Sequence, residues 1–240
     1  MTTDPATRRY ARIAGGFYLL SFASIPTLAL YGRIHEPDFL TSDASPTPVV
    51  VGGLLEIVVA LACIGTAVAL HPVLRTYGPA RALGFVAARV TEATAILVGV
   101  AALLTVLTLK RAGEAADAPA VGHALVAFYD ANFLLSQGLI PAANALLLGT
   151  LLYRSRLVPR ALPMIGFVGA ALLVASDVGT LFGMWDRLSP LAAIAVVPIA
   201  GWELALGVHL VVKGLRPGPT AEPPQSMVSR PPRTASASST

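Results

Sequence analysis

The hydrophobic pattern divides the chain into six long apolar runs, separated by short segments that hold most of the polar residues. Each run contains about 20 residues or more, enough for a helix to cross the hydrocarbon core of a bilayer. We therefore predict an all-α fold, a polytopic transmembrane bundle of about six membrane-spanning helices. The runs cover approximately residues 13–31, 49–70, 83–109, 121–153, 162–184 and 191–212.

Two of these runs are predicted to be irregular. Pro26 lies in the outer part of the first run, and a proline without a backbone N–H bends a helix. The fourth run is too long for one straight crossing at about 1.5 Å per residue, and it contains Pro141. We expect that helix to be kinked or broken.

Three segments fall outside the apolar runs and shape the domain organisation. Residues 1–12 form a basic N-terminal segment, and residues 13–214 form the six-helix transmembrane domain. Within that domain, residues 32–48 are rich in proline and acidic residues, which is typical of an exposed loop. Residues 215–240 are rich in Pro, Ser and Thr and have too few apolar residues to fold, so we predict a disordered tail.

The composition indicates a protein that resides in lipid. Hydrophobic residues make up 55% of the chain and charged residues 12%, with a mean hydropathy of +0.71, whereas a soluble domain carries about 25% charged residues. The formal net charge of +4 could suggest a nucleic-acid partner, but the basic residues stand in short segments between apolar runs. We therefore expect membrane lipids, and no nucleic acid, as partners.

The distribution of lysine and arginine predicts the orientation. Twelve of the 17 basic residues lie in the N-terminal segment, in the turns after the second and fourth runs, and after the sixth run. By the positive-inside rule these segments stay in the cytoplasm. We expect a multi-pass protein of the cell membrane with both termini in the cytoplasm.

Ionisable residues inside the apolar runs carry the candidate chemistry. Arg89 and Glu92 are three residues apart and so share one helical face. A charge at the centre of a bilayer costs about 2.5 to 3.5 kcal/mol even on insertion scales. Some of the carboxyls must therefore be protonated, reach a water-filled cavity, or neutralise a bound cation. Four other runs each hold one further carboxyl: Glu56, Asp130, Asp177 and Glu203.

Two arrangements of these groups remain open. In the first, a polar pocket opens to the outside, and Arg89 closes its inner end by pairing with Glu92 or Glu203. In the second, the same groups are interhelical hydrogen-bonding contacts of about 0.6 kcal/mol each that hold the bundle in one arrangement. The predicted spans place Glu56, Asp130 and Asp177 in the outer half of the bilayer. They place Glu92 and Glu203 nearer its middle.

A polar stripe marks the fourth run. Asp130, Gln137 and Asn144 recur at intervals of seven residues, which places them on nearly the same face of a helix. With Pro141 between them, unpaired backbone carbonyls can join that face, as in the broken helices of transporters. The alternative is an ordinary kinked helix whose polar face packs inward. Both hypotheses keep the stripe away from lipid.

No metal or cofactor site is predicted. The sequence has no Gly-rich phosphate loop, nucleophile elbow or catalytic Cys/His arrangement. The only cysteine, Cys63, lies inside an apolar run and is expected to be a small packed side chain. The histidines fall in loops or near helix ends without the spacing of a zinc site; they are His35, His71, His123 and His209.

Small residues four apart occur in two runs, as Ala145 with Gly149 and Gly179 with Gly183. Such pairs let two helices approach closely. We interpret them as packing sites within the chain in preference to a dimer interface, and a homo-oligomer remains open.

Five motifs stand in a fixed order across the six runs: Arg12 to Leu20, Leu54-Leu55-Glu56, Arg89-Val90-Thr91-Glu92-Ala93, Gly149 to Ser155 continuing to Pro159-Arg160, and Trp202-Glu203-Leu204-Ala205-Leu206-Gly207. In this order the chain resembles the bacterial membrane proteins of the domain of unknown function 4386 family, from Arg12 to about Gly214. The resemblance implies a six-helix integral protein of the bacterial plasma membrane, and it implies no activity. Its recurrent positions correspond here to Glu56, Arg89, Glu92, Asn144 and Glu203.

Three functions are compatible with this pattern. The leading hypothesis is a non-enzymatic transporter or sensor whose intramembrane pocket handles a proton, a cation or a small cationic ligand. The second is an intramembrane hydrolase or transferase with Asp130 or Glu92 as acid or base. The third is a structural or accessory membrane subunit. The candidate pocket residues are Glu56, Arg89, Glu92, Asp130, Gln137, Asn144, Asp177 and Glu203.

Overall fold

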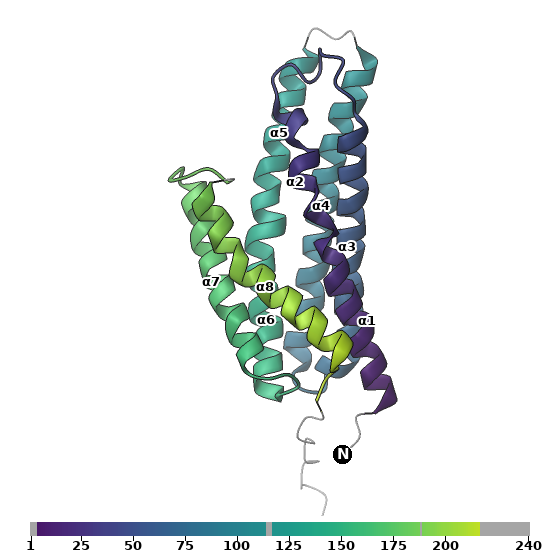
Figure 1. Cartoon of the computed structure of the whole chain (residues 1–240), viewed down its shortest axis with the longest axis vertical. Helices are drawn as coiled ribbons and strands as arrows, with labels where there is room; N and C mark the ends of the chain where they lie inside the picture. The colour runs from purple at the N-terminus through teal and green to yellow at the C-terminus, as the bar shows by residue number, and fades with distance from the viewer. Residues whose placement is uncertain (1–3, 114–116, 188, 217–240) are drawn as a thin grey trace, which may run out of the picture.

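The computed structural model describes residues 4–113, 117–187 and 189–216, which form a bundle of long helices (Figure 1). No strand occurs in this described part of the chain. In chain order the elements are α1 (Pro5–Ser21), η1 (Phe22–Ser24), α2 (Thr27–Leu30), η2 (Gly32–His35), α3 (Thr47–Leu74), α4 (Pro79–Ala112), α5 (Ala118–Leu134), η3 (Leu135–Leu139), α6 (Ile140–Ser155), α7 (Ala161–Leu181) and α8 (Pro190–Val212).

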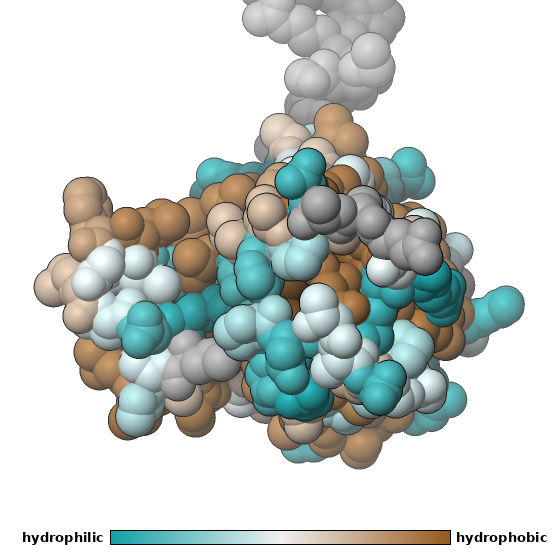
Figure 2. All heavy atoms as spheres, turned by 90° about the horizontal axis from the view of Figure 1, so that it is seen from above, coloured by the Kyte–Doolittle hydropathy of each residue, from teal (hydrophilic) through white to brown (hydrophobic). Residues whose placement is uncertain are grey.

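The predicted six spans are confirmed. Within the described residues, six helical segments are long and apolar enough to cross a membrane: Pro5–Leu30, Thr47–Leu74, Pro79–Ala112, Ala118–Ser155, Ala161–Leu181 and Pro190–Val212. Their outer faces carry apolar side chains such as Leu61 and Val68, which are 59% and 62% exposed and suit lipid contact. Seen from above, apolar residues surround hydrophilic residues gathered on the upper end (Figure 2). The chain is a multi-pass membrane protein.

The spans form a closed ring. Each helix packs against its neighbours in the order α1, α3, α4, α6, α7 and α8, and α8 returns to α1. α5 continues α6 upward and packs on α4 (Figure 1). Since α2 makes little contact with α8, the ring is tight at the end that carries the termini and looser toward the other end.

Two apolar cores lie at opposite ends of this ring. The lower core joins α1, α3, α4, α6, α7 and α8 around fully buried Trp202 and Phe85. The upper core joins η2 and the following loop to α4 and α5 around Ile34 and Phe39. The polar groups of the spans lie between the two cores, so apolar packing holds the polar layer from both ends.

The helices extend beyond the predicted apolar runs. α1 begins at Pro5, whereas the apolar run predicts a start near Ile13, and α4 covers Pro79–Ala112 in place of the predicted 83–109. Hydropathy marks where a helix leaves the lipid, but a helix can continue into water. Asp4 accepts a hydrogen bond from the Ala6 N–H at 3.3 Å, and Pro5 occupies the first helical position, which fixes the start of α1.

The fourth run is one continuous span with a local irregularity. The disturbance is η3, a π-helical turn over Leu135–Leu139, and it precedes Pro141, which lies in the first turn of α6. Proline has no N–H to donate to the carbonyl of Gln137, four residues earlier, so the regular hydrogen-bond register cannot continue there. The helix is widened ahead of the proline and is not broken at it.

Pro26 has the predicted effect on the first span. The α-helix stops at Ser21, and α2 resumes only at Thr27. The Ile25 N–H donates to the Phe22 carbonyl at 3.1 Å, which closes a tighter 3₁₀ turn before the proline. The α-helix of the first span is therefore interrupted between Ser21 and Thr27, at the level where the polar layer begins.

Two segments predicted to be exposed or disordered are partly buried. In the loop over residues 32–48, the side chains of Ile34 and Phe39 are buried in the upper core, and Lys110 donates hydrogen bonds to the carbonyls of Phe39 and Ser42. The predicted tail, residues 215–240, lies outside the described residues from 217 onward. Its start is ordered, because Leu215 is buried in the lower core.

One glycine of each predicted small-residue pair makes room for an aromatic ring of this chain, whereas Gly183 follows α7 and has nothing within 4 Å of its Cβ position. A side chain on Gly149 would overlap the ring of Phe167 on α7. A side chain on Gly179 would overlap the ring of Trp185, in the turn that follows α7. Both glycines leave room for an aromatic ring of this chain.

A very close helix crossing lies between α1 and α8. A Cβ atom on Gly15 would stand 2.7 Å from the carbonyl oxygen of Gly207, which is backbone and cannot move aside. The next residue, Gly16, has nothing within 4 Å of the equivalent position. The two neighbours provide a matched pair for testing the crossing.

We predict that Gly15→Ala destabilises the protein by about 1–3 kcal/mol, because the added methyl group forces α1 and α8 apart. Gly16→Ala should be neutral or stabilising by up to about 1 kcal/mol, because alanine favours the helix. Unfolding of both variants in lipid nanodiscs measures the difference. Equal stabilities of the two variants would contradict this crossing.

Candidate functional site

A buried arginine on α4 lies at the centre of the polar layer. The side chains of Arg89 and Glu92 are only 4% and 6% exposed. One helical turn separates them, and the Arg89 Nη1 donates to the two carboxylate oxygens of Glu92 at 3.0 and 3.2 Å. The predicted pairing of Arg89 with Glu92 is present, with a geometry that a helical spacing of three residues allows.

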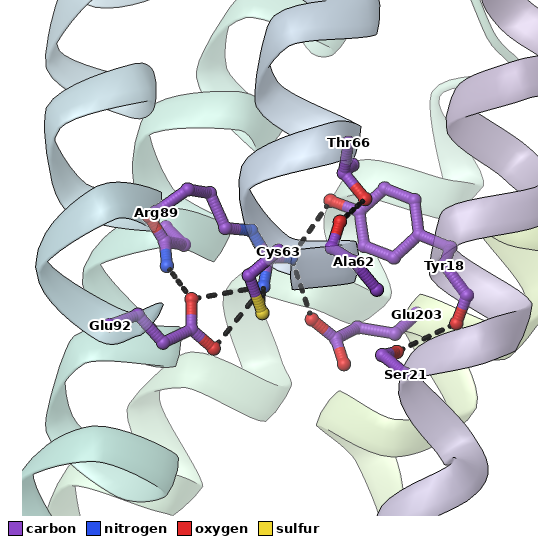
Figure 3. Close-up of polar contacts among 9 residues, drawn as sticks. Tyr18, Ser21, Ala62, Cys63, Thr66, Arg89, Glu92 and Glu203 are labelled. Carbon is purple, nitrogen blue, oxygen red and sulfur yellow. Dashed lines mark hydrogen bonds and ion pairs between the residues drawn. The ribbon is translucent and has the colours of Figure 1, made fainter. Parts of the chain in front are cut away.

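The same guanidinium reaches three other helices (Figure 3). Its Nη2 donates to the hydroxyl of Tyr18 on α1 and to Oε1 of Glu203 on α8, both at 3.1 Å. Its Nη1 also lies 3.5 Å from the sulfur of Cys63 on α3. The sequence leaves Glu92 and Glu203 as alternative partners, whereas the planar fork of five N–H donors accommodates both.

A fifth helix completes this Arg89 cluster. The Asn144 side chain on α6 donates to Oε2 of Glu92 at 2.5 Å and is almost fully buried. The guanidinium carbon lies 5.2 Å from the ring centre of Tyr18 and 5.8 Å from that of Phe85. These aromatic faces stabilise the buried cation.

The Arg89 cluster has an uncompensated negative charge and an accessible oxygen. One guanidinium faces two carboxylates, so the formal charge is −1 when both are ionised. The Glu203 side chain is 22% exposed, unlike that of Glu92. Its second oxygen, which points away from Arg89 in Figure 3, makes no hydrogen bond to any described residue.

A cavity of about 550 Å³ adjoins this oxygen. It extends from the Arg89 cluster past Gln137 toward Phe133 and Arg187, between the η1–α2 segment and α8. Most of its wall is apolar. The wall residues Ile25, Leu28 and Val196 are 61%, 60% and 43% exposed on the flank of the bundle, so this side of the cavity meets the lipid.

Glu56 forms a second polar cluster, on α3. Its carboxyl is 1% exposed and accepts hydrogen bonds from the Tyr129 hydroxyl at 2.7 Å and the Gln137 amide at 3.5 Å. Among the described residues it has no ion-pair partner. Gln137, in the π-helical turn η3, also lines the large cavity, so its side chain lies between the two clusters.

Asp130 belongs to a third group, near the upper end. Its Oδ1 accepts from Arg187 Nη2 at 2.6 Å and lies 3.1 Å from Nε2 of His35. The carboxylate hydrogen bond raises the pKa of His35 above its ordinary value, because it stabilises the imidazolium. Arg187 also lies over the ring of Phe133, at 4.7 Å from the ring centre.

Asp177 stands alone. Its side chain is buried, and Oδ2 has no hydrogen-bond partner in the described residues. It packs against Gly138 in the π-helical turn, where any side chain would overlap the carboxyl group. It is not among the residues that line the cavity.

The structure therefore distributes the eight predicted site residues over separate places. Arg89, Glu92, Asn144 and Glu203 meet in one cluster, while Glu56 with Gln137, Asp130, and Asp177 occupy three others. The members of the predicted stripe have different partners: Asp130 pairs with Arg187, Gln137 with Glu56 and Asn144 with Glu92.

Three contributing residues lie outside the predicted set. The Tyr18 hydroxyl accepts a hydrogen bond from Arg89 in the first cluster. The Tyr129 hydroxyl donates a hydrogen bond to Glu56 in the second. Arg187 stands between two apolar runs in the sequence, yet it folds over the top of the cavity. A usable signal existed for Tyr18 and Tyr129, because each hydroxyl stands in an apolar run where it needs a partner.

One protein family matches most of the chain. Residues 13–214 match the family described as Domain of unknown function (DUF4386). The chain belongs to this family. The DUF4386 match includes every residue of the Arg89 and Glu56 clusters. No curated protein and no solved structure matches the chain.

The site offers no evident metal centre. Within residues 4–113, 117–187 and 189–216, no group of three or more His, Cys, Asp and Glu side chains could hold a metal ion. The DUF4386 chain instead has a polar cluster of one guanidinium and two carboxyl groups at one end of an apolar cavity.

We predict that Arg89→Ala costs about 3–5 kcal/mol of stability, because it leaves two buried carboxylates without a cation. Adding Glu92→Gln and Glu203→Gln to that variant should restore at least half of the loss, since no unpaired charge remains. Unfolding in nanodiscs gives the values. Arg81→Ala, an exposed position of the same helix, is the control, and a similar effect at both positions would refute a central role for Arg89.

Proposed function

We propose that the cavity binds a small organic cation with an apolar body. The observation that carries the proposal is the free carboxylate oxygen of Glu203 at the cavity wall. A bound cation would neutralise the formal charge of −1 that Arg89 leaves in its cluster, and a carboxylate in a low-dielectric site attracts a cation more strongly than it does in water.

The walls support the apolar part of this ligand. A volume of about 550 Å³ falls within the range of small-molecule sites, about 300 to 1,000 Å³, and such sites are mainly apolar with a few convergent polar groups. Ile25, Leu28 and Val196 bring the wall to the lipid-facing surface. A lipid-soluble cation could therefore enter from the bilayer without crossing either apolar core.

An enzymatic role for Asp130 or Glu92 lacks a comparable observation. Glu92 is held by Arg89 and Asn144, and Asp130 by Arg187 and His35. Each carboxylate is thus already engaged by an arginine and by a second polar side chain. If the protein binds no ligand, that result supports a purely structural or accessory role.

We also propose that the end carrying the termini faces the cytoplasm, in a bacterial plasma membrane. In the described residues, both chain ends lie at the same end of the bundle (Figure 1). The turns at that end and the flanking helix ends hold most of the basic residues, which favours retention in the cytoplasm. They include Arg8, Arg9, Arg12, Arg75, Arg81, Arg154, Arg156, Arg160, Lys213 and Arg216.

We predict that the protein in nanodiscs binds tetraphenylphosphonium and does not bind tetraphenylborate, an anion of nearly the same shape. Glu203→Gln should weaken binding of the cation at least tenfold, about 1.4 kcal/mol, because it removes the free carboxylate. Equilibrium dialysis against empty nanodiscs corrects for partition of both ions into lipid.

The matched control is Glu36→Gln, which changes an exposed carboxylate paired with Arg33 outside the cavity. It should leave binding unchanged. Equal binding of the two ions, or equal binding by the Glu203 and Glu36 variants, would contradict a cation site at Glu203.

The orientation is tested by a reporter fused after residue 240. We expect a reporter that works only in the cytoplasm to be active, and a reporter that works only outside to be inactive. The same pair of reporters placed in the loop near Asp43 should give the reverse result. The opposite pattern at both positions would overturn the proposed orientation.

A further inference from the structure

Glu56 is a buried carboxyl group that the proposed cation site does not use. It is 1% exposed, and no described Lys, Arg or His lies within ion-pair distance of it. Its hydrogen-bond partners, Tyr129 and Gln137, are uncharged, and both donate to the same oxygen, Oε1. An isolated ionised carboxylate at such a position is costly, whereas the neutral acid needs only hydrogen bonds.

A second hydroxyl, that of Tyr31, lies beside the Glu56 carboxyl. The hydroxyl of Tyr31 faces Glu56, is buried, and makes no hydrogen bond in the described structure. The absence of a side chain on Gly52, one turn before Glu56, leaves the space that the Tyr31 ring fills. A proton on Glu56 Oε2 could be donated to this hydroxyl oxygen, so the neutral acid would satisfy both groups.

The surroundings contain few other charges. On α4, the side chains of Ile96 and Val100 pack with Val59 of α3 and are apolar. The titratable and charged groups that act on Glu56 are Tyr31, Tyr129 and Arg187. Arg187 is already paired with Asp130. The protonation of Glu56 is therefore sensitive to any new charge that enters the neighbouring cavity.

Gln137 connects Glu56 to that cavity. Its amide nitrogen donates to Glu56 at 3.5 Å, a long hydrogen bond, while the same side chain lines the cavity wall. A cation in the cavity attracts the amide oxygen of Gln137. The polarised amide then donates more strongly to Glu56, and this interaction favours the ionised carboxylate.

A route for the proton leads to the upper end. Tyr31 and Tyr129 line a small cavity of about 150 Å³ together with His35 and Arg187. The side chain of His35 is 34% exposed. A proton that leaves Glu56 could pass by the two hydroxyls and this cavity to water.

We propose that Glu56 is a proton-binding site, neutral while the large cavity is empty, and that it releases its proton when a cation enters. The proposal rests on the cation site proposed above and makes the protein a proton–cation exchanger. The O–H bond of the Glu56 carboxyl breaks, its electron pair stays on Oε2, and the proton goes to water at the end near His35. One positive charge enters the bundle as another leaves.

The experiment adds tetraphenylphosphonium to the full chain in lightly buffered detergent that contains a pH-sensitive dye. We expect about one proton released for each cation bound near neutral pH. Glu56→Gln, which replaces the neutral acid by a neutral amide of the same shape, should still bind the cation and release no proton. Infrared spectra of the cation-free protein should show a protonated carboxyl band that is lost when the cation binds and that Glu56→Gln lacks.

The outcomes separate the two proposals. Cation binding without proton release, or release that persists in Glu56→Gln, overturns the exchange proposal and leaves the cation site intact. No binding by the unchanged protein overturns both. Glu203→Gln is the matched control: it should lose binding and release together while retaining the infrared band of Glu56. Loss of that band in Glu203→Gln would also count against a separate proton site.

Discussion

The arrangement of this bundle depends on one guanidinium that has no access to bulk water. Arg89 is charged under all ordinary conditions, so the fold must supply its hydrogen bonds and counter-charge from within. Tyr18, Glu92 and Glu203, which belong to α1, α4 and α8, accept hydrogen bonds from its two Nη atoms, while its buried Nε has no partner among the described residues. Helices that are far apart in sequence are thereby held in one arrangement around a single arginine side chain.

This requirement also explains why the cavity is where it is. Two apolar cores close the bundle above and below, and the polar layer between them cannot be filled by hydrocarbon side chains without leaving polar atoms unpaired. The η1–α2 segment and α8 diverge at this level, so space remains beside Glu203. The charged cluster and the cavity are two results of the same packing problem.

The six spans and part of the site could be predicted from sequence because lipid imposes strict rules. Backbone groups must be paired inside each helix, and ionisable groups must face inward, so their positions in apolar runs suffice to identify Arg89, Glu92 and Glu203. Helix ends such as Pro5 were not predictable, since a capped basic segment is helical in water as well. The π-helical turn was not predicted from the sequence, because the hydrogen-bond register depends on tertiary packing around Pro141. The contribution of Arg187 to the site was not predicted either, because a loop residue can fold back onto any neighbouring helix.

The distance in sequence between Arg89 and Glu203 has a consequence for biosynthesis. The two residues are 114 positions apart, and Glu203 lies on the last of the six spans to be synthesised. While the ribosome is still making α8, Glu203 is missing, and the completed helices offer Arg89 the carboxylate of Glu92 and the hydroxyl of Tyr18. The cavity has no wall on the α8 side until that helix inserts. A nascent chain that lacks α8 therefore has one carboxylate fewer beside Arg89 and one wall fewer around the cavity than the complete bundle.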